Sequence, residues 1–400
     1  MSKLGEIAMI GKTLPDLNKR ERQVLSHIAD CHTERMGSNT LSCECGNREI
    51  HYNSCRDRHC PLCQGAARAK WVRERLNELL PVSYFHVVFT IPKELHSLAR
   101  ANHKIFYKAL FQSVHNTLLE VCANKENLGG RIGGLSVLHT WTQKLTYHPH
   151  LHCIVPSGGV SPDGKHWIVG NSKYLVPVKK LSAVFRGKLL SALRKYCDRD
   201  ELFGNIASYN KALYGAASKP FVVYAKKPFG SPAQVIKYLG RYTHRVGISE
   251  QRIVSINEKN VCFTWLDRAG GHKRKKMTLS HSEFVHRFLF HLLPRGMRKI
   301  RYFGYMSNRD RQNSIEQVRQ LIGETGISCA EGLDEISKPD KESDDVKPGK
   351  NLCCKCGREM SLWGHHEIES LPDSEPGWLG RRLEKRRNIH GPEPNKHKAS

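Results

Sequence analysis

The pattern of hydrophobic and polar positions predicts several amphipathic helices. Between residues 14 and 35, Pro15 is followed by apolar side chains at near-helical spacing, and this pattern predicts a helix. The same period predicts helices over residues 68–80, 94–125 and 179–196. Residues 232–244 place a proline in the first turn and predict a further helix.

Shorter apolar runs between these segments predict strands. The strands are expected at residues 84–90, 135–145, 151–155 and 220–225. Farther on, residues 252–257 and 260–266 predict a hairpin, and the cations of residues 272–276 predict a basic loop. Because strands and helices interleave and a hairpin is present, we expect an α+β fold on a mainly antiparallel sheet.

The composition indicates which class of partner a protein of this fold would bind. Lys plus Arg number 64 against 38 Asp plus Glu, for a formal net charge of +26. Such an excess favours a polyanion, most simply DNA or RNA, over a merely basic surface or an anionic membrane. We find no apolar run of the roughly 20 residues that span a bilayer and no signal peptide, so we expect a cytoplasmic protein without a membrane partner.

Fourteen cysteines in a reducing compartment indicate metal sites rather than disulfides. Between residues 31 and 63 the composition becomes rich in Cys, His and Arg, which is typical of a small module folded around Zn²⁺. One arrangement of four ligands uses Cys43 and Cys45 with Cys60 and Cys63. Other candidate ligands for this ion, or for a second one, are Cys31, His32, Cys55 and His59. We expect a structural site that also contacts DNA.

A second cysteine cluster follows a polar stretch at residues 330–350 that is typical of a linker. Cys353, Cys354 and Cys356 precede His365 and His366, so the cluster is either one metal site or a set of unrelated thiols.

His150 and His152 form the first candidate for a catalytic element. Side chains alternate along a strand, so both imidazoles lie on one face and can share a metal ion. The alternative is a chance His-x-His on a half-exposed strand. A third ligand is needed, and His86 and His244 are the leading choices.

Tyr238 and Tyr242 form the second candidate. Residues four apart on a helix share a face, although such a pair is also common in half-buried helix stripes. The helix carries cations around the pair, at Lys237, Arg241, His244 and Arg245. Tyrosine has an ordinary pKa near 10, so attack on a phosphodiester requires nearby positive charge or a base. A divalent ion would polarise that phosphate.

The order of these motifs resembles the two-tyrosine HUH rolling-circle transposases of the insertion sequence ninety-one type. The stretches that carry the resemblance span roughly residues 20–325 and are Asn53–Gln64, His86–Thr90, His139–Gln143, His148–His152, Tyr238–Arg245, Leu293–Gly296 and Ile300–Tyr302. One departure is Cys43-Glu44-Cys45-Gly46, which is one residue shorter than the family's Cys-x2-Cys-Gly.

The resemblance implies a small zinc-binding domain followed by an HUH-endonuclease-like antiparallel sheet with helices. On this basis we expect domains at residues 1–78 and 79–325, with a linker, cysteine cluster and basic tail at 326–400. His150 and His152 are then ligands of catalytic Mg²⁺ or Mn²⁺, and Tyr238 and Tyr242 are nucleophiles that form a 5′-phosphotyrosine. Zn²⁺ is structural.

The implied activity is that of a bacterial transposase, nucleoid-associated when bound to DNA, which cleaves and rejoins single-stranded DNA at element ends without a small-molecule substrate. Alternatives are a plasmid-type replication initiator or relaxase, and a zinc-dependent DNA-binding regulator without catalysis. Candidate phosphate contacts lie near the zinc knuckle, on the tyrosine helix, in the basic loop and in the run 295–301. They are Arg56, Arg58, Lys237, Arg241, Arg245, Lys273, Arg274 and Arg298.

Overall fold

In a computed structural model, segments that are far apart in the sequence come together in two units. The structure describes residues 2–171, 173–197, 206–226, 247–267, 270–271, 273–307, 310–325 and 352–366, and also Gln234, Ile236 and Gly240. The first unit joins Met1–Cys31 to Cys55–Gly349, and the second joins His32–Ser54 to Lys350–Ser400. This division differs from the expected boundaries after residues 78 and 325, because each unit combines segments that are far apart in the sequence.

The first unit is built on a sheet that, within the described residues, has five strands. Their order is β12 (Ile300–Gly304), β4 (Gly133–Trp141), β5 (Tyr147–Pro156), β3 (Tyr84–Thr90) and β8 (Val223–Lys226). Every neighbouring pair is antiparallel, which confirms the expected α+β class. The expected strand at residues 135–145 ends earlier, because the chain turns after Trp141 to enter β5.

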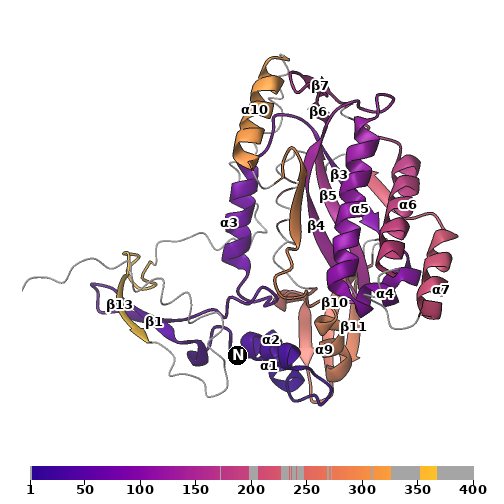
Figure 1. Ribbon diagram of the computed structural model, residues 1–400. Coiled ribbons are helices and arrows are strands. Elements are labelled where there is room, and N and C mark those ends of the chain that lie inside the picture. Colours follow the sequence, from indigo (N-terminus) through magenta and orange to yellow (C-terminus); the bar gives the residue numbers. More distant parts are fainter. Residues whose placement is uncertain are drawn as a thin grey trace, which may run out of the picture. The chain divides into compact units, whose positions relative to one another are not determined.

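Helices cover both faces of this sheet (Figure 1). On one face, α5 (His103–Ala123), α6 (Val178–Cys197) and α7 (Ile206–Ala217) enclose the larger apolar core. On the other, α3 (Gly65–Leu76) and α10 (Arg311–Gly323) pack on a smaller cluster around Val137 and Ile154. These two layers explain why the strand sequences are apolar on both faces.

The helix expected over residues 94–125 is interrupted at Asn102. The short elements η2 (Lys93–Leu95) and α4 (His96–Ala101) precede α5. Asn102 has φ −144° and ψ 81°, and its side chain accepts a hydrogen bond from the Ile105 N–H at 3.2 Å. An asparagine that caps the next helix therefore ends the first one.

The alternation of side chains along β5 decides which face of the central sheet carries His150 and His152. On β5, Leu151 and Cys153 belong to the larger core, whereas Ile154 belongs to the smaller cluster with α3 and α10. The even-numbered residues His150 and His152 therefore lie on the α3 side. Ile236 is 1% exposed in that same cluster, and a Cβ atom on Gly240 would lie 2.2 Å from Val72 Cγ2 of α3. The three described residues of the expected helix at 232–244 are helical, and two of them, Ile236 and Gly240, pack on the histidine-bearing side.

A second sheet of the first unit has the order β11 (Lys273–Ser280), β10 (Asn260–Asp267) and β9 (Ile253–Ile256). The hairpin expected at residues 252–266 is present, but the expected basic loop at 272–276 is wrong: residues 273–276 begin β11. The strand was not predicted because its consecutive cations do not alternate with apolar residues. An edge strand can point charged side chains to solvent on both faces, so it needs no such alternation.

Near this sheet, α9 (His281–Leu289) packs against α1 (Lys3–Gly11). Neither of these two helices was predicted from the sequence pattern. The helix expected at 14–35 is the shorter α2 (Lys19–Asp30), whose N-cap Asn18 forms a capping box with Glu21. The first unit also contains two short paired strands, β6 (Gly158–Val160) and β7 (Trp167–Val169), and the 3₁₀ turn η3 (Glu250–Arg252); the 3₁₀ turn η1 (Glu34–Met36) belongs to the second unit.

The second unit contains the antiparallel order β13 (Ser361–His366), β1 (Ser38–Ser42) and β2 (Arg48–Tyr52). The expected linker at residues 330–350 lies outside the described residues. Among the helices that the structure describes, none is long and apolar enough to cross a membrane.

Candidate metal centre and basic pocket

Three imidazoles meet on the α3 side of the central sheet. In the register of β4 and β5, His139 lies opposite His150, and Val137 lies opposite His152. One ring nitrogen from each of His139, His150 and His152 lies within 4.8 Å of the others. His139 and His152 are buried and His150 is half-buried. This arrangement suits three imidazole ligands on one metal ion.

Hydrogen bonds orient two of these rings. His150 Nδ1 donates to the carbonyl oxygen of His148 at 2.6 Å, which leaves the Nε2 lone pair of His150 for a metal. His152 Nδ1 lies 2.7 Å from His86 Nε2, and the two rings are stacked with an interplanar angle of 9°. When His152 donates this bond, its Nε2 also keeps a lone pair.

The protonation state of the cluster suits metal binding. Burial lowers the pKa of His139 well below its usual range, and the neighbouring His152 and His150 lower it further. Burial also lowers the pKa of His150 to about 4 and that of His86 to about 4. The rings of His139, His150 and His86 are therefore neutral near pH 7, the form that binds metal.

The structure brings His150 and His152 together, as the sequence led us to expect, but it supplies a different third nitrogen. His86 contacts His152 and stands outside the group of three, whereas His139 completes it. His244 lies outside the described residues. His139 falls on a predicted strand, but the sequence does not reveal which strand lies opposite His150.

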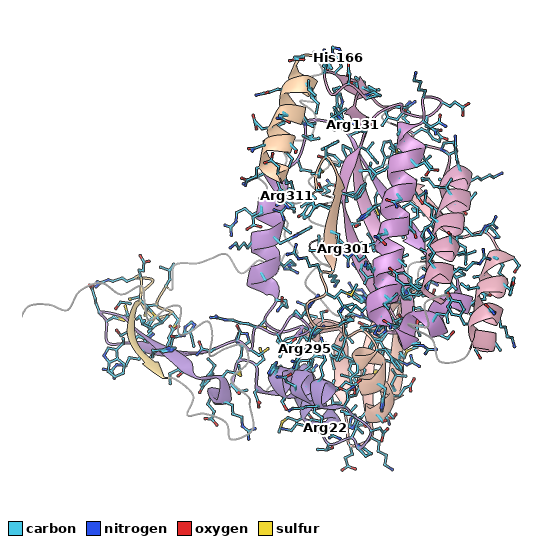
Figure 2. All side chains as sticks on the ribbon, in the orientation of Figure 1. Arg22, Arg131, His166, Arg295, Arg301 and Arg311 are labelled. Carbon is cyan, nitrogen blue, oxygen red and sulfur yellow. The ribbon has the colours of Figure 1, made fainter. Side chains whose placement is uncertain are left out.

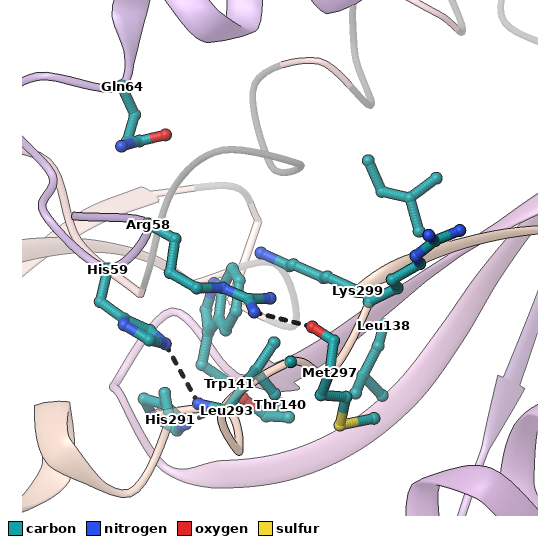
Figure 3. A pocket seen from close by; sticks show the side chains of 13 residues that line it. Arg58, His59, Gln64, Leu138, Thr140, Trp141, His291, Leu293, Met297 and Lys299 are labelled. Atoms are coloured by element: carbon teal, nitrogen blue, oxygen red, sulfur yellow. Dashed lines mark hydrogen bonds between the residues drawn. The ribbon is translucent and has the colours of Figure 1, made fainter. Parts of the chain in front are cut away.

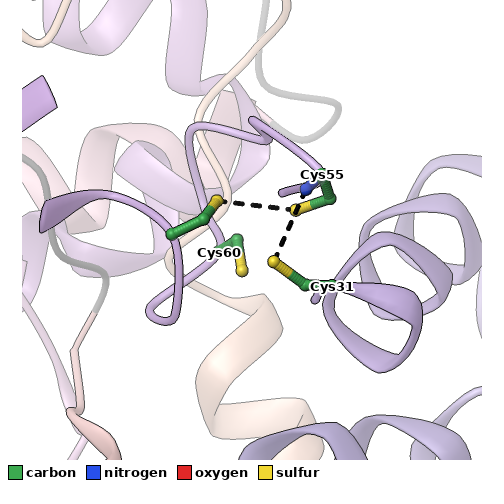
Figure 4. A group of neighbouring side chains, drawn as sticks. Cys31, Cys55 and Cys60 are labelled. Carbon is green, nitrogen blue, oxygen red and sulfur yellow. Dashed lines mark hydrogen bonds between the residues drawn. The ribbon is translucent and has the colours of Figure 1, made fainter. Parts of the chain in front are cut away.

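Four buried or half-buried thiols form a separate group in the first unit. Cys31 follows the end of α2, and Cys55, Cys60 and Cys63 come from the loop between β2 (Arg48–Tyr52) and α3; all four sulfurs lie within 4.8 Å (Figure 4). The Sγ atoms of Cys55 and Cys63 are 3.7 Å apart. Four thiolates at this spacing suit tetrahedral Zn²⁺.

The structure divides the expected ligand set. Cys60 and Cys63 belong to the first group, whereas Cys43 and Cys45 lie near Cys353 and Cys356 in the second unit. Cys31, which we had named only as an alternative ligand, completes the first group. The expected arrangement of Cys43, Cys45, Cys60 and Cys63 around one ion is therefore corrected: local spacing could not reveal the pairing of Cys43 and Cys45 with residues some three hundred positions away.

The loop Cys55–Cys63 is fixed by hydrogen bonds to residues 293–297. His59 Nε2 accepts from the Leu293 N–H at 3.2 Å, and Arg58 Nη1 donates to the Met297 carbonyl at 2.7 Å (Figure 3). Burial would raise the pKa of the half-buried Asp57 carboxyl, but hydrogen bonds from His27 and His59 hold this pKa well below the usual range. Both ring nitrogens of His59, another candidate zinc ligand, are therefore engaged in hydrogen bonds, Nδ1 with Asp57 and Nε2 with Leu293.

A pocket of about 420 Å³ lies between this loop and the central sheet (Figure 3). Arg58, Arg298 and Lys299 supply positive charge, and Trp141 supplies an aromatic wall. Lys299 Nζ lies 4.5 Å from the centre of the Trp141 ring, and that ring stacks on His139 at 5.0 Å. Burial lowers the pKa of Lys299 to about 7. The pocket therefore adjoins the three imidazoles and combines cations with an aromatic surface, as single-stranded nucleic-acid sites do.

Other expected phosphate contacts lie elsewhere. Arg56 is exposed with φ 54°, and Lys273 and Arg274 are exposed on β11. In the run 295–301, Arg295 lies beside α2 and hydrogen-bonds Gln23 at 3.1 Å, while Arg301 on β12 stacks over the ring of Phe111 at 4.2 Å (Figure 2). The expected nucleophiles and their cations, Tyr238, Tyr242, Lys237, Arg241 and Arg245, lie outside the described residues.

Two family models match this chain. The one described as "Transposase zinc-binding domain" matches residues 8–91, and the one described as "Putative transposase" matches residues 133–314. The first model covers the loop that carries Cys31, Cys55, Cys60 and Cys63, and the second covers β4 and β5.

Two curated proteins are similar over most of the chain. The "Putative transposase y4qJ" of Sinorhizobium fredii (strain NBRC 101917 / NGR234) is 44% identical over 316 residues, which cover 77% of this chain and 79% of the relative. The "Transposase for insertion sequence element IS801" of Pseudomonas savastanoi pv. phaseolicola is 27% identical over 310 residues, covering 72% of this chain and 71% of the relative.

Solved structures give only a weak likeness. A copper-bound structure of the conjugative relaxase TrwC with oriT DNA has a TM-score of 0.22 at 14% identity, covering 40% of this chain and 68% of that chain. A metal-bound structure of the same relaxase with oriT DNA has a TM-score of 0.22 at 15% identity, covering 40% and 70%. Scores this low carry no argument about the fold or the site.

Proposed function

Because this chain belongs to the IS91 family of transposases, we propose that it cleaves and rejoins single-stranded DNA at the ends of a mobile element by metal-assisted tyrosine transesterification. The transposase family and the positive charge support DNA as the partner. The chemistry is proposed from the residues of the candidate site.

The observation that carries the proposal is the meeting of His139, His150 and His152 beside a basic pocket. The three imidazoles would hold a divalent ion, and His86 would orient His152. Mg²⁺ prefers oxygen ligands, whereas imidazole suits transition ions; of Mg²⁺ and Mn²⁺, the donor set therefore favours Mn²⁺. Such an ion would polarise the scissile phosphate and stabilise its developing charge.

The pocket residues would hold the DNA strand. Arg58, Arg298 and Lys299 offer cations to successive phosphates, and the Trp141 ring offers a stacking surface for a base. Since Trp141 also stacks on His139, a base bound there would bring the neighbouring phosphate close to the histidines. In this arrangement the zinc loop contributes Arg58 directly to the strand.

Tyr238 and Tyr242 are the proposed nucleophiles. Their described neighbours Ile236 and Gly240 pack on the same side of the sheet as the histidines, which supports a position near them. A tyrosine hydroxyl would lose its proton as its oxygen bonds to phosphorus, and the bond from phosphorus to the 3′ oxygen would break. The products are a 5′-phosphotyrosine and a 3′-OH, and attack by another 3′-OH would reverse the reaction and join strands.

The test uses the full chain with labelled single-stranded DNA carrying the element ends and Mn²⁺ or Mg²⁺. We expect a covalent adduct that mass spectrometry maps to Tyr238 or Tyr242. The double variant Tyr238→Phe/Tyr242→Phe should form none, whereas Tyr214→Phe, at a tyrosine that is 70% exposed on α7, should react normally.

A metal-site variant separates chemistry from binding. His150→Ala/His152→Ala should abolish cleavage while retaining DNA binding, and His166→Ala, at an exposed histidine, should retain both (Figure 2). Full DNA binding by the wild type with no adduct under any metal would instead identify a non-catalytic DNA-binding protein. An adduct at another residue would also refute the proposed mechanism.

A further inference from the structure

The second unit brings together cysteines from two distant parts of the chain. Cys43 and Cys45 lie in the turn between β1 and β2, and Cys353 and Cys356 lie in the turn before β13. Their four Sγ atoms lie within 4.8 Å of one another. The Sγ atoms of Cys43 and Cys356 are 3.4 Å apart, and those of Cys45 and Cys353 are 3.6 Å apart.

We infer that these four cysteines form a second Zn²⁺ site, which fastens the C-terminal segment 352–366 to the hairpin β1–β2. A tetrahedral zinc ion with Zn–S distances of about 2.3 Å requires sulfurs about 3.8 Å apart. A disulfide would require about 2.05 Å. All four thiols are free in this structure, and the measured separations are near the tetrahedral value.

The backbone on both sides is shaped as a pair of metal-binding turns. Gly46 and Gly357 follow the second cysteine of each pair with φ of +83° and +72°, a conformation that favours glycine. The Gly46 N–H donates to the Cys43 carbonyl and the Gly357 N–H donates to the Cys353 carbonyl, each at 2.9 Å. These matching turns direct two cysteine side chains from each segment to one point.

A hydrogen bond from outside the four thiols supports the same centre. Asn47 Nδ2 donates to Cys353 Sγ at 3.4 Å. Amide donors of this kind stabilise a thiolate, the form in which cysteine binds zinc.

The second unit has little else to hold it together. Among its described residues, the apolar cluster consists of Leu41, Cys43, Cys353 and Met360, so two of its four members are proposed ligands. Leu362 and Trp363 of β13 are 63% and 58% exposed. Units with so small a core usually require a metal or disulfides to fold.

The site would explain why β13 joins this sheet at all. β13 pairs with β1 from Ser38 opposite His366 to Ser42 opposite Ser361, with a bulge after Thr40. A short strand far along the chain must meet the entropic cost of closing a long loop, and a shared zinc ion supplies the required free energy. Cys353 and Cys356 lie beyond both family matches, which end at residues 91 and 314, so neither match assigns this site.

The first test counts zinc per chain by inductively coupled plasma mass spectrometry on the full protein purified under reducing conditions. We expect Cys353→Ser/Cys356→Ser to hold one zinc ion fewer than the wild type. The neighbouring Cys354 is exposed and stands outside the group, so Cys354→Ser should keep the wild-type count. A zinc count unchanged by the double substitution would overturn the inference.

The second test needs no variant and so does not depend on folding of a mutant. Cys45, Cys354 and Cys356 are all exposed. Alkylation followed by mass spectrometry should modify Cys354 quickly, whereas Cys45 and Cys356 should react only after a strong chelator is added. Equal reactivity of the three thiols before chelation, or a disulfide that involves Cys43, Cys45, Cys353 or Cys356, would refute the site.

Discussion

At the scale of single residues, the metal centre depends on the hydrogen bond between His86 and His152. The bond of 2.7 Å can hold the proton of His152 on Nδ1 and leave Nε2 for the metal. Loss of such a partner typically weakens metal binding by about 10- to 100-fold. We expect this loss in His86→Ala, measured as Mn²⁺ affinity by calorimetry.

The graded variants distinguish an orienting residue from a ligand. His86→Gln can still accept a hydrogen bond and should recover part of the affinity, while His139→Ala should lose more than His86→Ala. If His86→Ala removed Mn²⁺ binding as completely as His150→Ala/His152→Ala, His86 would be a ligand, as the sequence first led us to expect.

Lys299 gives the pocket a pH dependence. Burial lowers the pKa of Lys299 from 10.5 to about 7, so the side chain loses its charge as pH rises through that value. A bound phosphate favours the charged form, and affinity for single-stranded DNA should therefore fall by about tenfold between pH 6 and pH 8. The effect is measured by fluorescence anisotropy without added Mn²⁺ or Mg²⁺, so that no metal at the histidines contributes and the structural zinc is retained.

Charge-fixed variants provide the controls for this titration. Lys299→Arg stays charged and should bind tightly at both pH values, whereas Lys299→Met should bind weakly at both. His150 and His291 have pKa values lowered to about 4 by burial, and burial lowers the pKa of His139 well below its usual range, so these three neighbours stay neutral in this window. If both variants kept the wild-type fall in DNA affinity between pH 6 and pH 8, the titration would belong to groups other than Lys299.

The lowered pKa of Lys299 also makes the stability of the folded chain depend on pH. Between pH 7 and 10.5 the unfolded chain binds the proton that the folded chain releases, so this residue makes folding less favourable as pH falls through that range. Phosphate binding in the pocket offsets the cost, which is consistent with a residue retained for DNA.

At the scale of elements, β11 presents a row of cations on an edge strand. Trp265 of β10 lies opposite Lys275, which pairs with Asp267 at 2.8 Å, and the Lys144 Nζ lies 4.1 Å over the Trp265 ring. Arg274 and Lys276 point to the other face and are exposed. An edge strand with this charge can follow a nucleic-acid backbone.

The double variant Arg274→Ala/Lys276→Ala should bind single-stranded DNA more weakly and with a smaller salt dependence. Each lost phosphate contact reduces the slope of log K against log salt by about 0.7, so the expected change is about 1.4. Arg194→Ala/Lys195→Ala removes two exposed cations from α6 and should leave the slope unchanged. Equal slopes for both variants and the wild type would exclude β11 from the DNA-binding surface.

The elements also show what the sequence pattern could and could not predict. The buried strands β3, β4 and β5 were predicted because they are short apolar runs, and His150 and His152 were predicted to share a face because strands alternate. β11 was missed because consecutive lysines and arginines conceal alternation. His139 was missed as a ligand because the register that places it opposite His150 depends on the tertiary fold.

At the scale of the whole molecule, the two cysteine groups show the limit of local motifs. Cys55, Cys60 and Cys63 were recognisable as a metal loop because their spacing is short. Cys43 and Cys45 have partners at Cys353 and Cys356, and a sequence alone gives no distance across three hundred residues. The compact units therefore differ from the predicted domains at the place where the chain returns to an early hairpin.

Metal binding at the three histidines should also be measurable as stability of the whole chain. A ligand that binds only the folded state at 100 times its Kd stabilises that state by about 2.7 kcal/mol. The unfolded chain scatters His139, His150 and His152, so Mn²⁺ at that excess should raise the free energy of unfolding of the first unit by this amount, measured by urea titration.

His150→Ala/His152→Ala should gain no stability from Mn²⁺, and His166→Ala should gain as much as the wild type. The cysteine groups prefer Zn²⁺ to Mn²⁺, so in protein whose cysteine groups hold Zn²⁺ and whose histidines are free of metal, Mn²⁺ should act through the histidines alone. Equal stabilisation of the double variant would mean that Mn²⁺ acts elsewhere, and the three imidazoles would then lose their assignment as the catalytic metal site.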